Sequence, residues 1–366
     1  MTKRKKSGLT ASKGLILFLC LASLIIVPSY LFIQKSEPKP TSITGLEIDP
    51  SNASILYQVQ PKVSLNELSK DLESKGLITH AKLFKYFLIL SRQDKKIRAG
   101  YFYINPSNSI VDLVYKLTSG KMATQTITIP EGKASWEIYT ILISRFPLDS
   151  LRFDSLVHSP EFTRTCKIDA NSLEGYLFPD TYVLPWKVSE RDVLKVMVDR
   201  FHDVLKEVDL QSPVYKQYGL HGWLTLASIV EKEAAVPSEQ CTIAGVFLNR
   251  LKLGWSLGAD PTVRFAVRKP TGPLFVSDLE NNSPYNTRKF TGLPPGPICN
   301  PGRGALKAAL NPPVSNKMFF VAKDDGSREH FFSVDNSGHL KYKNVAAVNR
   351  TRRSGTSLPT KRKSIH

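Results

Sequence analysis

The first hydrophobic pattern in the chain is an uninterrupted apolar run. Residues 14–33 hold 20 positions without a charged side chain and are rich in Leu and Ile. As a helix, this run would be about 30 Å long, the thickness of one bilayer core. It is longer than the apolar part of a signal peptide, and no small-residue cleavage site follows it. We therefore expect a single transmembrane helix in the inner (plasma) membrane, with residues 1–13 in the cytoplasm and the rest of the chain outside.

After a polar, Pro-bearing linker at 34–43, segments with the apolar spacing of strands and segments with the apolar spacing of helices follow one another. Residues 46–59 alternate apolar and polar positions as a strand does. Ser64 precedes a helical repeat that includes Leu68 and Leu72 and ends near Gly76. Residues 81–93 predict a second helix, and 99–120 predict a strand, a turn and a helix stopped by Gly120. The pattern predicts a small α+β unit over 44–125, with strand-helix-helix-strand order.

A larger α+β domain is predicted for residues 126–349. It opens at 126–146 with a pattern typical of a strand, a turn and an amphipathic helix. Gly and Pro then cluster between positions 254 and 313, which indicates a region dominated by loops, where functional sites usually lie. The last 17 residues, 350–366, are basic and are predicted to be a disordered tail.

The charge pattern argues against a nucleic-acid-binding protein. The formal net charge is +18, and the two tails, residues 1–13 and 350–366, hold eleven of the basic residues and no acid. Nucleic-acid binding needs the charge gathered on one folded face, with aromatic residues nearby. Basic tails are more often solvated or directed at a membrane surface, so we expect no nucleic-acid partner.

Several common catalytic motifs are absent from the sequence. It contains no HExxH, no phosphate-binding GxxxxGK[ST] and no GxSxG, and its seven histidines are scattered. We therefore expect neither a metal site nor a cofactor. Three cysteines, Cys166, Cys241 and Cys299, follow the apolar run without CxxC spacing, which allows one disulfide but does not fix its pairing.

The segment 223–235 (WLTLASIVEKEAA) is the strongest candidate for chemistry. Its spacing predicts a helix with one apolar stripe and with Thr225, Ser228 and Lys232 on the opposite side. Glu231 and Glu233 fall at the two edges of the stripe. A carboxyl held against apolar side chains has a raised pKa, as a general acid near neutral pH requires. The simpler interpretation is a surface helix with two solvated glutamates, which periodicity alone favours.

Other stretches combine acids, aromatic residues and amides in a way that suits sugar binding. They are EGYLFPDTY at 174–182, VFLNRL at 246–251, DPTV at 260–263, YNT at 285–287 and GLPPGPI-x-NPG at 292–302. Pro-Gly loops are also common for purely structural reasons. Together with LASIVEKEA at 226–234, and with FFVAKDDG and His330-Phe331 later on, these blocks closely resemble the membrane-anchored endolytic murein transglycosylase family. The resemblance covers 126–349, and the 44–125 unit looks like the LysM-like subdomain of that family.

The resemblance implies which residues act. Its catalytic acid is the second glutamate of the EKE triplet, Glu233 here, whereas helical periodicity alone only slightly favours it over Glu231. One departure is Ala234, because lytic transglycosylases generally carry Ser or Thr after the catalytic glutamate. Substrate positioning is assigned to five further residues: Tyr285, Asn286, Asp260, Asn249 and Glu174.

The implied reaction is a non-hydrolytic cut within peptidoglycan strands. Protonated Glu233 would protonate the oxygen between N-acetylmuramic acid and N-acetylglucosamine, and the 6-hydroxyl of the sugar would close to a 1,6-anhydro end. An internal nucleophile has a high effective molarity and needs no activated water. The implied partners are glycan strands, the membrane, and penicillin-binding proteins or the elongation and division machinery.

Two other functions fit the same sequence. A hydrolytic muramidase would need a second carboxylate, for which Glu174, Glu231 and Asp260 are candidates. A membrane-anchored, LysM-like wall-binding protein without activity would instead be consistent with Ala234. The type of chain end produced separates the first alternative from the transglycosylase, and the effect of replacing Glu233 separates the second.

Overall fold

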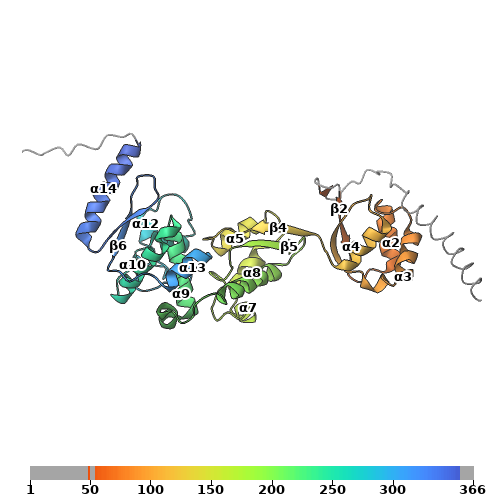
Figure 1. Ribbon diagram of the computed structural model, residues 1–366, viewed down its shortest axis with the longest axis horizontal. Helices are drawn as coiled ribbons and strands as arrows, with labels where there is room; N and C mark the ends of the chain where they lie inside the picture. Colours follow the sequence, from red (N-terminus) through yellow and green to blue (C-terminus); the bar gives the residue numbers. More distant parts are fainter. Residues whose placement is uncertain (1–47, 50–53, 355–366) are drawn as a thin grey trace, which may run out of the picture. The chain divides into compact units, whose positions relative to one another are not determined.

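The computed structural model describes residues 48–49 and 54–354, which divide into two compact units (Figure 1). Unit 1 runs to Gln125 and also takes in Pro185–Lys187, and unit 2 comprises Thr126–Leu184 and the chain from Val188 onward. Both contain helices and small sheets, so the predicted α+β class is confirmed. The predicted transmembrane segment 14–33 lies outside the described residues. Within them, no helix has both the length and the apolar character needed to cross a bilayer.

Unit 1 has the strand-helix-helix-strand order that its periodicity predicts. An antiparallel sheet in the order β1-β2-β3 is formed by β1 (Ile48–Asp49), β2 (Ser54–Val59) and β3 (Gly100–Ile104). Between β2 and β3 lie α2 (Leu65–Ser74), α3 (Ala81–Leu90) and the short 3-10 helix η1 (Asp94–Lys96). Ser64 caps α2 in a reciprocal capping box with Glu67. After β3, α4 (Ile110–Ser119) ends at Gly120 in the left-handed conformation that glycine tolerates best.

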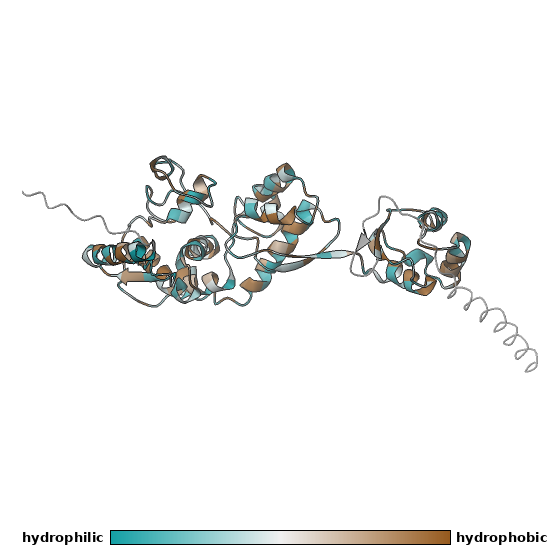
Figure 2. Cartoon of the chain, turned by 90° about the horizontal axis from the view of Figure 1, so that it is seen from above, coloured by the Kyte–Doolittle hydropathy of each residue, from teal (hydrophilic) through white to brown (hydrophobic). Residues whose placement is uncertain are grey.

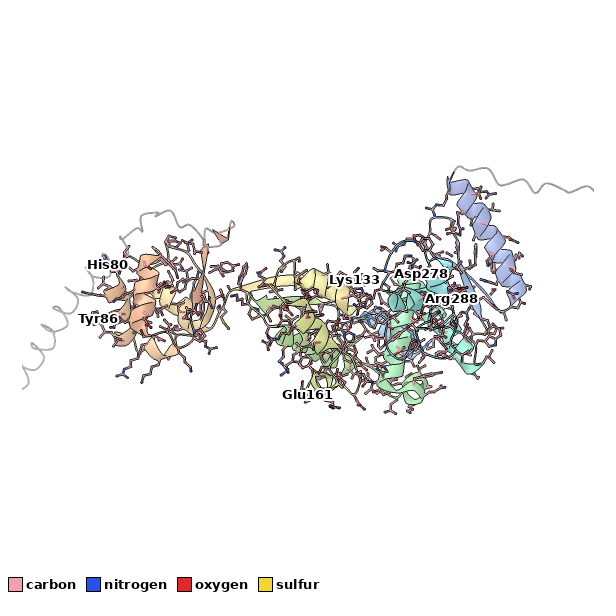
Figure 3. All side chains as sticks on the ribbon, turned by 180° about the vertical axis from the view of Figure 1, so that it is seen from behind. His80, Tyr86, Lys133, Glu161, Asp278 and Arg288 are labelled. Atoms are coloured by element: carbon pink, nitrogen blue, oxygen red, sulfur yellow. The ribbon has the colours of Figure 1, made fainter. Side chains whose placement is uncertain are left out.

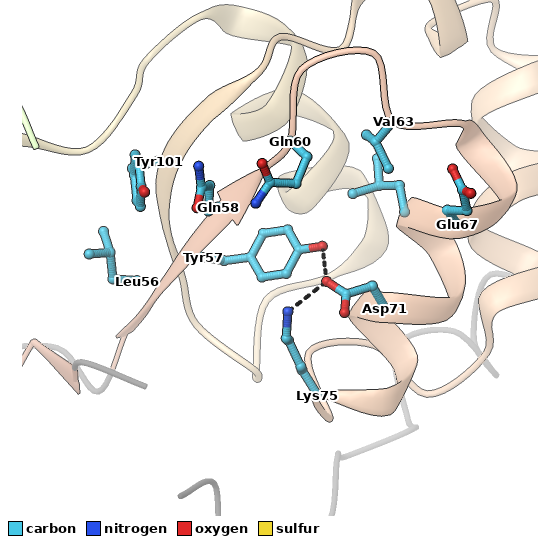
Figure 4. A pocket seen from close by; sticks show the side chains of 10 residues that line it. Leu56, Tyr57, Gln58, Gln60, Val63, Glu67, Asp71, Lys75 and Tyr101 are labelled. Carbon is cyan, nitrogen blue, oxygen red and sulfur yellow. Dashed lines mark hydrogen bonds and ion pairs between the residues drawn. The ribbon is translucent and has the colours of Figure 1, made fainter. Parts of the chain in front are cut away.

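The core of unit 1 lies between the sheet and its helices. Alternate residues of β2, among them Ile55, Tyr57 and Val59, join leucines of α2 and α4 in one apolar cluster. A pocket of about 530 Å³ lies beside β2 and α2. In it, Asp71 accepts hydrogen bonds from the Tyr57 hydroxyl (2.6 Å) and from Lys75 (2.7 Å) (Figure 4).

The first half of unit 2 is mainly helical. A two-stranded sheet, most of whose residues belong to unit 2, pairs β4 (Thr124–Thr128) with β5 (Thr181–Pro185). Between these strands lie α5 (Ser135–Leu142), α6 (Ser150–Val157) and α7 (Pro160–Thr165). The long helix α8 (Glu190–Leu205) follows β5 and buries an apolar face that includes Leu194 and Phe201. Figure 2 shows how hydrophobic and hydrophilic positions occupy different sides of such helices.

The second half of unit 2 is built around α9 (Pro213–Glu233). This helix contacts α13 (Arg303–Leu310), α10 (Gln240–Lys252) and α11 (Asp260–Ala266). The 3-10 helix η2 (Pro237–Glu239) precedes α10, and the short α12 (Val276–Leu279) lies within the Gly/Pro-rich region. An antiparallel hairpin of β6 (Phe319–Ala322) and β7 (His330–Ser333) follows, and then α14 (Asn336–Ser354).

Two predictions about α9 are wrong. The segment is not an amphipathic surface helix, because every residue from Trp223 to Val230 is buried, including Thr225 and Ser228. The hydroxyl of Ser228 donates to the Thr225 carbonyl and accepts from the amide of Ile298, so burial leaves it hydrogen-bonded. The helix also ends at Glu233 rather than at Ala235. The interpretation as a solvated surface helix is therefore excluded.

The C-terminal boundary also differs from the prediction. Helix α14 continues to Ser354, five residues into the stretch predicted to be a disordered tail, and Arg350 pairs with Asp324. Residues 355–366 lie outside the described part of the chain. Cys166, Cys241 and Cys299 are all free thiols, so the disulfide that the cysteine count allows is not formed among them.

Candidate active site

Glu233 occupies the last position of the buried helix α9. After it, Ala234 leaves the helical conformation (φ −77°, ψ 104°), so the chain turns away directly beyond the glutamate. Glu233 is half-buried, whereas residues 223–230 of the same helix are buried. Within residues 54–354, no hydrogen bond or ion pair engages its carboxyl group. A carboxyl group held this way can transfer its proton to a ligand without first breaking a bond within the protein.

The surroundings of Glu233 favour its protonated form. Burial, followed by the negative charge of Asp260, raises the pKa of Glu233 to about 7, and Arg250 and Arg288 oppose this rise. A general acid is most effective when its pKa lies near the working pH. The two arginines can also stabilise the carboxylate that remains after proton transfer. The site therefore supports both halves of an acid-base cycle.

Asp260 and Arg288 form an ion pair beside Glu233. Asp260 is the first residue of α11, and its Oδ1 accepts a hydrogen bond from Arg288 Nε at 2.6 Å. Both side chains are about half exposed, so solvent screens the pair. Arg288 is labelled in Figure 3. The negative charge of Asp260 and the positive charge of Arg288 thus both act on the Glu233 carboxyl group from neighbouring positions.

Two buried hydroxyl groups explain why the segments DPTV and YNT meet. Thr262 and Thr287 form a hydrogen bond between their Oγ1 atoms (2.8 Å), and both residues are fully buried. The backbone adds two more links, because the amide of Gly258 donates to the Thr287 carbonyl and that of Ala259 to the Thr287 hydroxyl. These links place Asp260 next to the residue that follows Thr287, which is Arg288.

Helix α10 holds Arg250 in a fixed position. Its Nε donates to the Met318 carbonyl (2.9 Å) and its Nη1 to the Leu257 carbonyl (2.6 Å). Its neighbour Asn249 donates both amide hydrogens, to the carbonyls of Ser315 (2.8 Å) and Lys317 (2.9 Å). The side chain of Asn249 therefore binds mainly the segment that leads into β6, and only its Oδ1 atom is left for a substrate.

Tyr285 belongs to a row of three half-buried aromatic side chains. Its ring lies 4.9 Å from that of Phe265, and Phe265 lies 4.9 Å from Trp136 on α5. The guanidinium of Arg268 is 5.3 Å above the Trp136 ring. Because Phe265 belongs to α11, the helix that begins with Asp260, the row starts from the same element as the charges around Glu233. Aromatic faces of this kind are common contact surfaces for sugars.

Asn286 lies inside its own loop. It is completely buried, its Nδ2 donates to the carbonyls of Leu279 (2.8 Å) and Asn281 (2.9 Å), and its Oδ1 accepts from the Arg288 amide (3.1 Å). The side chain therefore has neither exposed surface nor a free donor for a substrate. Its structural effect is to set the course of the backbone at Arg288.

Glu174 resembles Glu233 in acidity but differs in its contacts. Burial raises its pKa to about 7, and only 4% of its surface is exposed. Both oxygens accept from the amide of Ser135 (3.2 and 3.0 Å), and Oε1 also accepts from Asn300 Nδ2 (3.0 Å). Asn300 in turn accepts from the Leu177 amide (2.8 Å), so Glu174 joins the 291–302 loop to two other segments.

Glu231 also lies apart from the group around Glu233. Burial, followed by the charge of Glu131, raises its pKa, and its Oε2 accepts a long hydrogen bond (3.4 Å) from the amide of Gly302. The two edges of α9 thus hold different kinds of carboxyl group. Glu231 faces the start of α13, and Glu233 faces the arginines and Asp260.

Sequence reasoning missed several residues of this site. Arg288, Phe265 and Trp136 were not predicted, because a single arginine or aromatic residue carries no periodic signal. The one available clue was position, since Arg288 directly follows the YNT segment. In the described part of the chain, no group of three or more His, Cys, Asp or Glu side chains is arranged to hold a metal ion.

The chain is similar in sequence and in fold to known proteins. The sequence is 30% identical over 318 residues to the endolytic murein transglycosylase of Bacillus subtilis, covering 82% of this chain and 87% of that protein. It is 27% identical over 296 residues to the protein of the same name from Streptococcus pneumoniae D39, covering 71% of this chain and 52% of that longer protein. The crystal structure of a yceG-like protein from Listeria monocytogenes matches with a TM-score of 0.55 and 29% identity, over 79% of this chain and 98% of the other.

The chain also matches a whole protein family. The sequence profile of the YceG-like family aligns with residues 57–345, which include unit 1 from the middle of β2 onward and nearly all of the described part of unit 2. The blocks that suggested the resemblance, from 174–182 to 292–302, all lie within this range. The chain therefore belongs to the YceG-like family.

Proposed function

We propose that the protein is an endolytic lytic transglycosylase that cuts peptidoglycan strands and uses Glu233 as its only catalytic acid and base. The single observation that carries this proposal is the state of Glu233. Its pKa is raised to about 7, and no residue in the described ranges forms a hydrogen bond or ion pair with its carboxyl group. Glu174 has a similar pKa, but its oxygens are already engaged with Ser135 and Asn300.

The reaction proceeds by transfer of one proton in each direction. Protonated Glu233 donates its proton to the glycosidic oxygen that follows N-acetylmuramic acid, and the bond to the sugar carbon breaks. The carboxylate faces the positive charge that develops on the sugar, and Arg250 and Arg288 keep it from becoming too basic. It then removes the proton of the 6-hydroxyl as that oxygen closes onto the same carbon. The product is a 1,6-anhydro end, and Glu233 is again protonated.

The charges near Glu233 favour this route over attack by water. A hydrolytic enzyme needs a second carboxylate to activate water or to form a covalent intermediate. Asp260 is the carboxylate whose charge acts on Glu233, but it is paired with Arg288. Its Oδ1 atom already accepts a hydrogen bond from Arg288 (2.6 Å), so this oxygen is occupied and is not free to bind and activate a water molecule. The intramolecular hydroxyl needs no such activation, because it is already held close to the reacting carbon.

The remaining site residues divide into two groups. Tyr285 and Asp260 contact the glycan directly, Tyr285 as part of the row formed with Phe265 and Trp136. Asn286, Asn249 and Glu174 act as positioning residues, since their polar atoms bind the backbone of neighbouring segments. Ala234 supplies no hydroxyl next to the acid, so orientation of the carboxyl depends on the end of α9 itself.

The parts outside the catalytic unit confine the reaction to the wall that is being made. The apolar segment 14–33 anchors the chain in the plasma membrane, with the basic N-terminus in the cytoplasm and both units outside. Unit 1, with its two helices between two strands, serves as a LysM-like wall-binding unit. Nascent strands emerge at the membrane, where penicillin-binding proteins and the elongation and division machinery are the expected neighbours. Cell fractionation, with protease added from the outer side of the membrane, tests this topology.

Mass spectrometry of the chain ends tests the proposed chemistry. The full-length protein in detergent is incubated with purified sacculi, and the released ends are identified. Anhydro ends, lighter by one water than reducing ends, are the expected product. Reducing ends would show that water attacks and that the protein is a muramidase. Binding to sacculi without any new ends would show a wall-binding protein.

A further inference from the structure

Unit 2 contains a polar cavity to which the proposed reaction assigns no ligand group. Its volume is about 490 Å³, within the usual range for small-ligand sites. One wall is formed by α7 and the loop that follows it, with Arg164, Asp169 and Asn171. The cavity is also lined by Tyr285, His221 and the Pro-Gly loop at 295–297.

Two opposite charges in this cavity lack partners. The side chains of Arg164 and Asp169 are both exposed, and neither forms a hydrogen bond or an ion pair with any residue in the described ranges. They line the same cavity without pairing with each other. At the candidate active site, by contrast, Asp260 and Arg288 are paired. A free cation and a free anion in one cavity suit a ligand that carries both charges.

Two other polar side chains that line the cavity, His221 and Glu174, already have hydrogen-bond partners within the protein. The Nε2 atom of His221 bonds to the Pro295 carbonyl (2.9 Å), and since a carbonyl only accepts, Nε2 carries the hydrogen. The Nδ1 atom therefore accepts from the Tyr176 hydroxyl (2.8 Å). Glu174 is also fully hydrogen-bonded. The groups left for a ligand are thus Arg164 and Asp169, together with the Asn171 amide and the hydroxyls of Ser172 and Tyr285.

The cavity lies some distance from the reacting bond. Helix α9 is regular after Gly219, and His221 precedes Glu233 by twelve positions, which corresponds to about 18 Å along the helix axis. Tyr285 connects the two regions, because its ring packs on Phe265 while its side chain lines the cavity. A ligand group bound here would belong to the same substrate but not to the sugar being cut.

We infer that this cavity binds the peptide branch of the glycan strand and selects branches that are not yet cross-linked. The inference rests on the proposed function. An acetamido sugar is uncharged, whereas the peptide attached to a muramyl unit carries carboxylates and, before cross-linking, the free amine of its diamino acid. Arg164 binds a carboxylate of the branch, and Asp169 binds the amine. Cross-linking converts that amine to an amide and removes its charge, so the cavity favours newly made strands.

Three forms of the same substrate test this inference with the full-length protein in detergent. The first is uncross-linked strands that carry peptides, the second is the same strands with their amines acetylated, and the third is strands freed of peptides by an amidase. The readout is kcat/KM for formation of 1,6-anhydro ends. Arg164→Gln and Asp169→Asn remove one charge each. Lys216→Gln is the control, because Lys216 is an exposed cation of unit 2 outside the cavity.

The wild-type protein should prefer the first substrate by about tenfold or more over the other two, as expected for losing a hydrogen bond between charged groups. Arg164→Gln should lose about tenfold on peptide-bearing strands and far less on peptide-free strands. Asp169→Asn should become insensitive to acetylation, and Lys216→Gln should match the wild type throughout.

Equal wild-type rates on all three substrates would overturn the inference while leaving the proposed function intact. The inference would also be overturned if Arg164→Gln and Asp169→Asn lowered kcat/KM by the same factor on all three substrates. If the wild-type protein formed no anhydro ends on any of them, the proposed function itself would fail. Circular dichroism of each variant identifies any loss of folding, which is not expected for exposed side chains.

Discussion

The Oδ1 atom of Asp260 accepts a hydrogen bond of 2.6 Å from Nε of Arg288, and the charges of both residues act on Glu233. The ion pair is partly exposed, and the two segments that carry it are held together by the buried hydrogen bond between Thr262 and Thr287. Asp260 raises the pKa of Glu233 and Arg288 lowers it. Burial contributes most to the raised pKa of Glu233, and these two residues, which are far apart in the sequence, adjust it in opposite directions.

Replacing Asp260 and replacing Arg288 should shift the pH dependence of activity in opposite directions. Glu233 must be protonated to act, so activity should fall as the pH rises through about 7. Asp260→Asn removes the negative charge that favours protonation, and the alkaline limb of kcat/KM should move to lower pH. Arg288→Gln removes a positive charge, and the limb should move to higher pH. Shifts in the same direction, or no shifts, would show that these charges do not control Glu233.

The aromatic row should contribute to substrate binding rather than to chemistry. Trp136→Ala removes the ring that packs against Phe265, and KM for glycan strands should rise by about tenfold, with little change in kcat. Trp136→Phe keeps an aromatic face and should recover most of the affinity. A fall in kcat with an unchanged KM would contradict a binding role for this row.

Asn286 should affect stability more than substrate affinity. Asn286→Ala leaves the carbonyls of Leu279 and Asn281 and the amide of Arg288 without their partner in a buried loop. Such losses cost about 1–3 kcal/mol of unfolding free energy. Thermal unfolding should show a lower Tm for this variant. An unchanged Tm together with a raised KM would instead indicate that Asn286 contacts the substrate directly.

The raised pKa of Glu233 should also appear in the stability of the fold. A carboxyl with a pKa of about 7 in the folded state and 4.5 when unfolded keeps its proton longer when folded. Its contribution to stability is complete below pH 4.5 and is lost as the pH rises through about 7. Glu233→Gln cannot ionise, so its Tm should fall less across this window than that of the wild type.

The control for this measurement is Glu161→Gln. Glu161 is an exposed glutamate on α7 (Figure 3). Its replacement removes one carboxyl group, as Glu233→Gln does, but this group is exposed to solvent. Its Tm should follow the pH dependence of the wild type. Parallel curves for Glu233→Gln and the wild type would show that Glu233 is ionised at mild acidity.

The sequence predicted the local elements of unit 1 well. Ser64, the leucine repeat and Gly120 are signals within one element, so periodicity and capping rules place the helix boundaries from a few neighbouring residues. Helix α9 was predicted as a helix, but its environment was not. Thr225 and Ser228 looked like a solvated face, yet α13 and the 291–302 loop cover that side. What covers a helix depends on segments distant in sequence, which periodicity does not record.

The candidate site shows the same limit. Glu233, Asp260 and Tyr285 were predicted, and the structure gives each an accessible polar group. Asn286 and Glu174 were grouped with them because amides and carboxylates suit sugar binding, but their hydrogen bonds are made within the protein. Residue type alone cannot tell whether a polar atom is already satisfied. Arg288 was missed for the related reason that its role arises from a partner 28 positions away.

Comparing the wild-type protein with Glu233→Gln is the most direct test of the central claim. Full-length proteins, matched by circular dichroism and by binding to sacculi, are incubated with uncross-linked strands, and anhydro ends are counted by mass spectrometry. The variant should bind as the wild type does and lose about 10²–10⁴-fold in rate, the usual contribution of a general acid. Anhydro ends formed by Glu233→Gln at the wild-type rate would contradict the assignment of Glu233 as the catalytic acid.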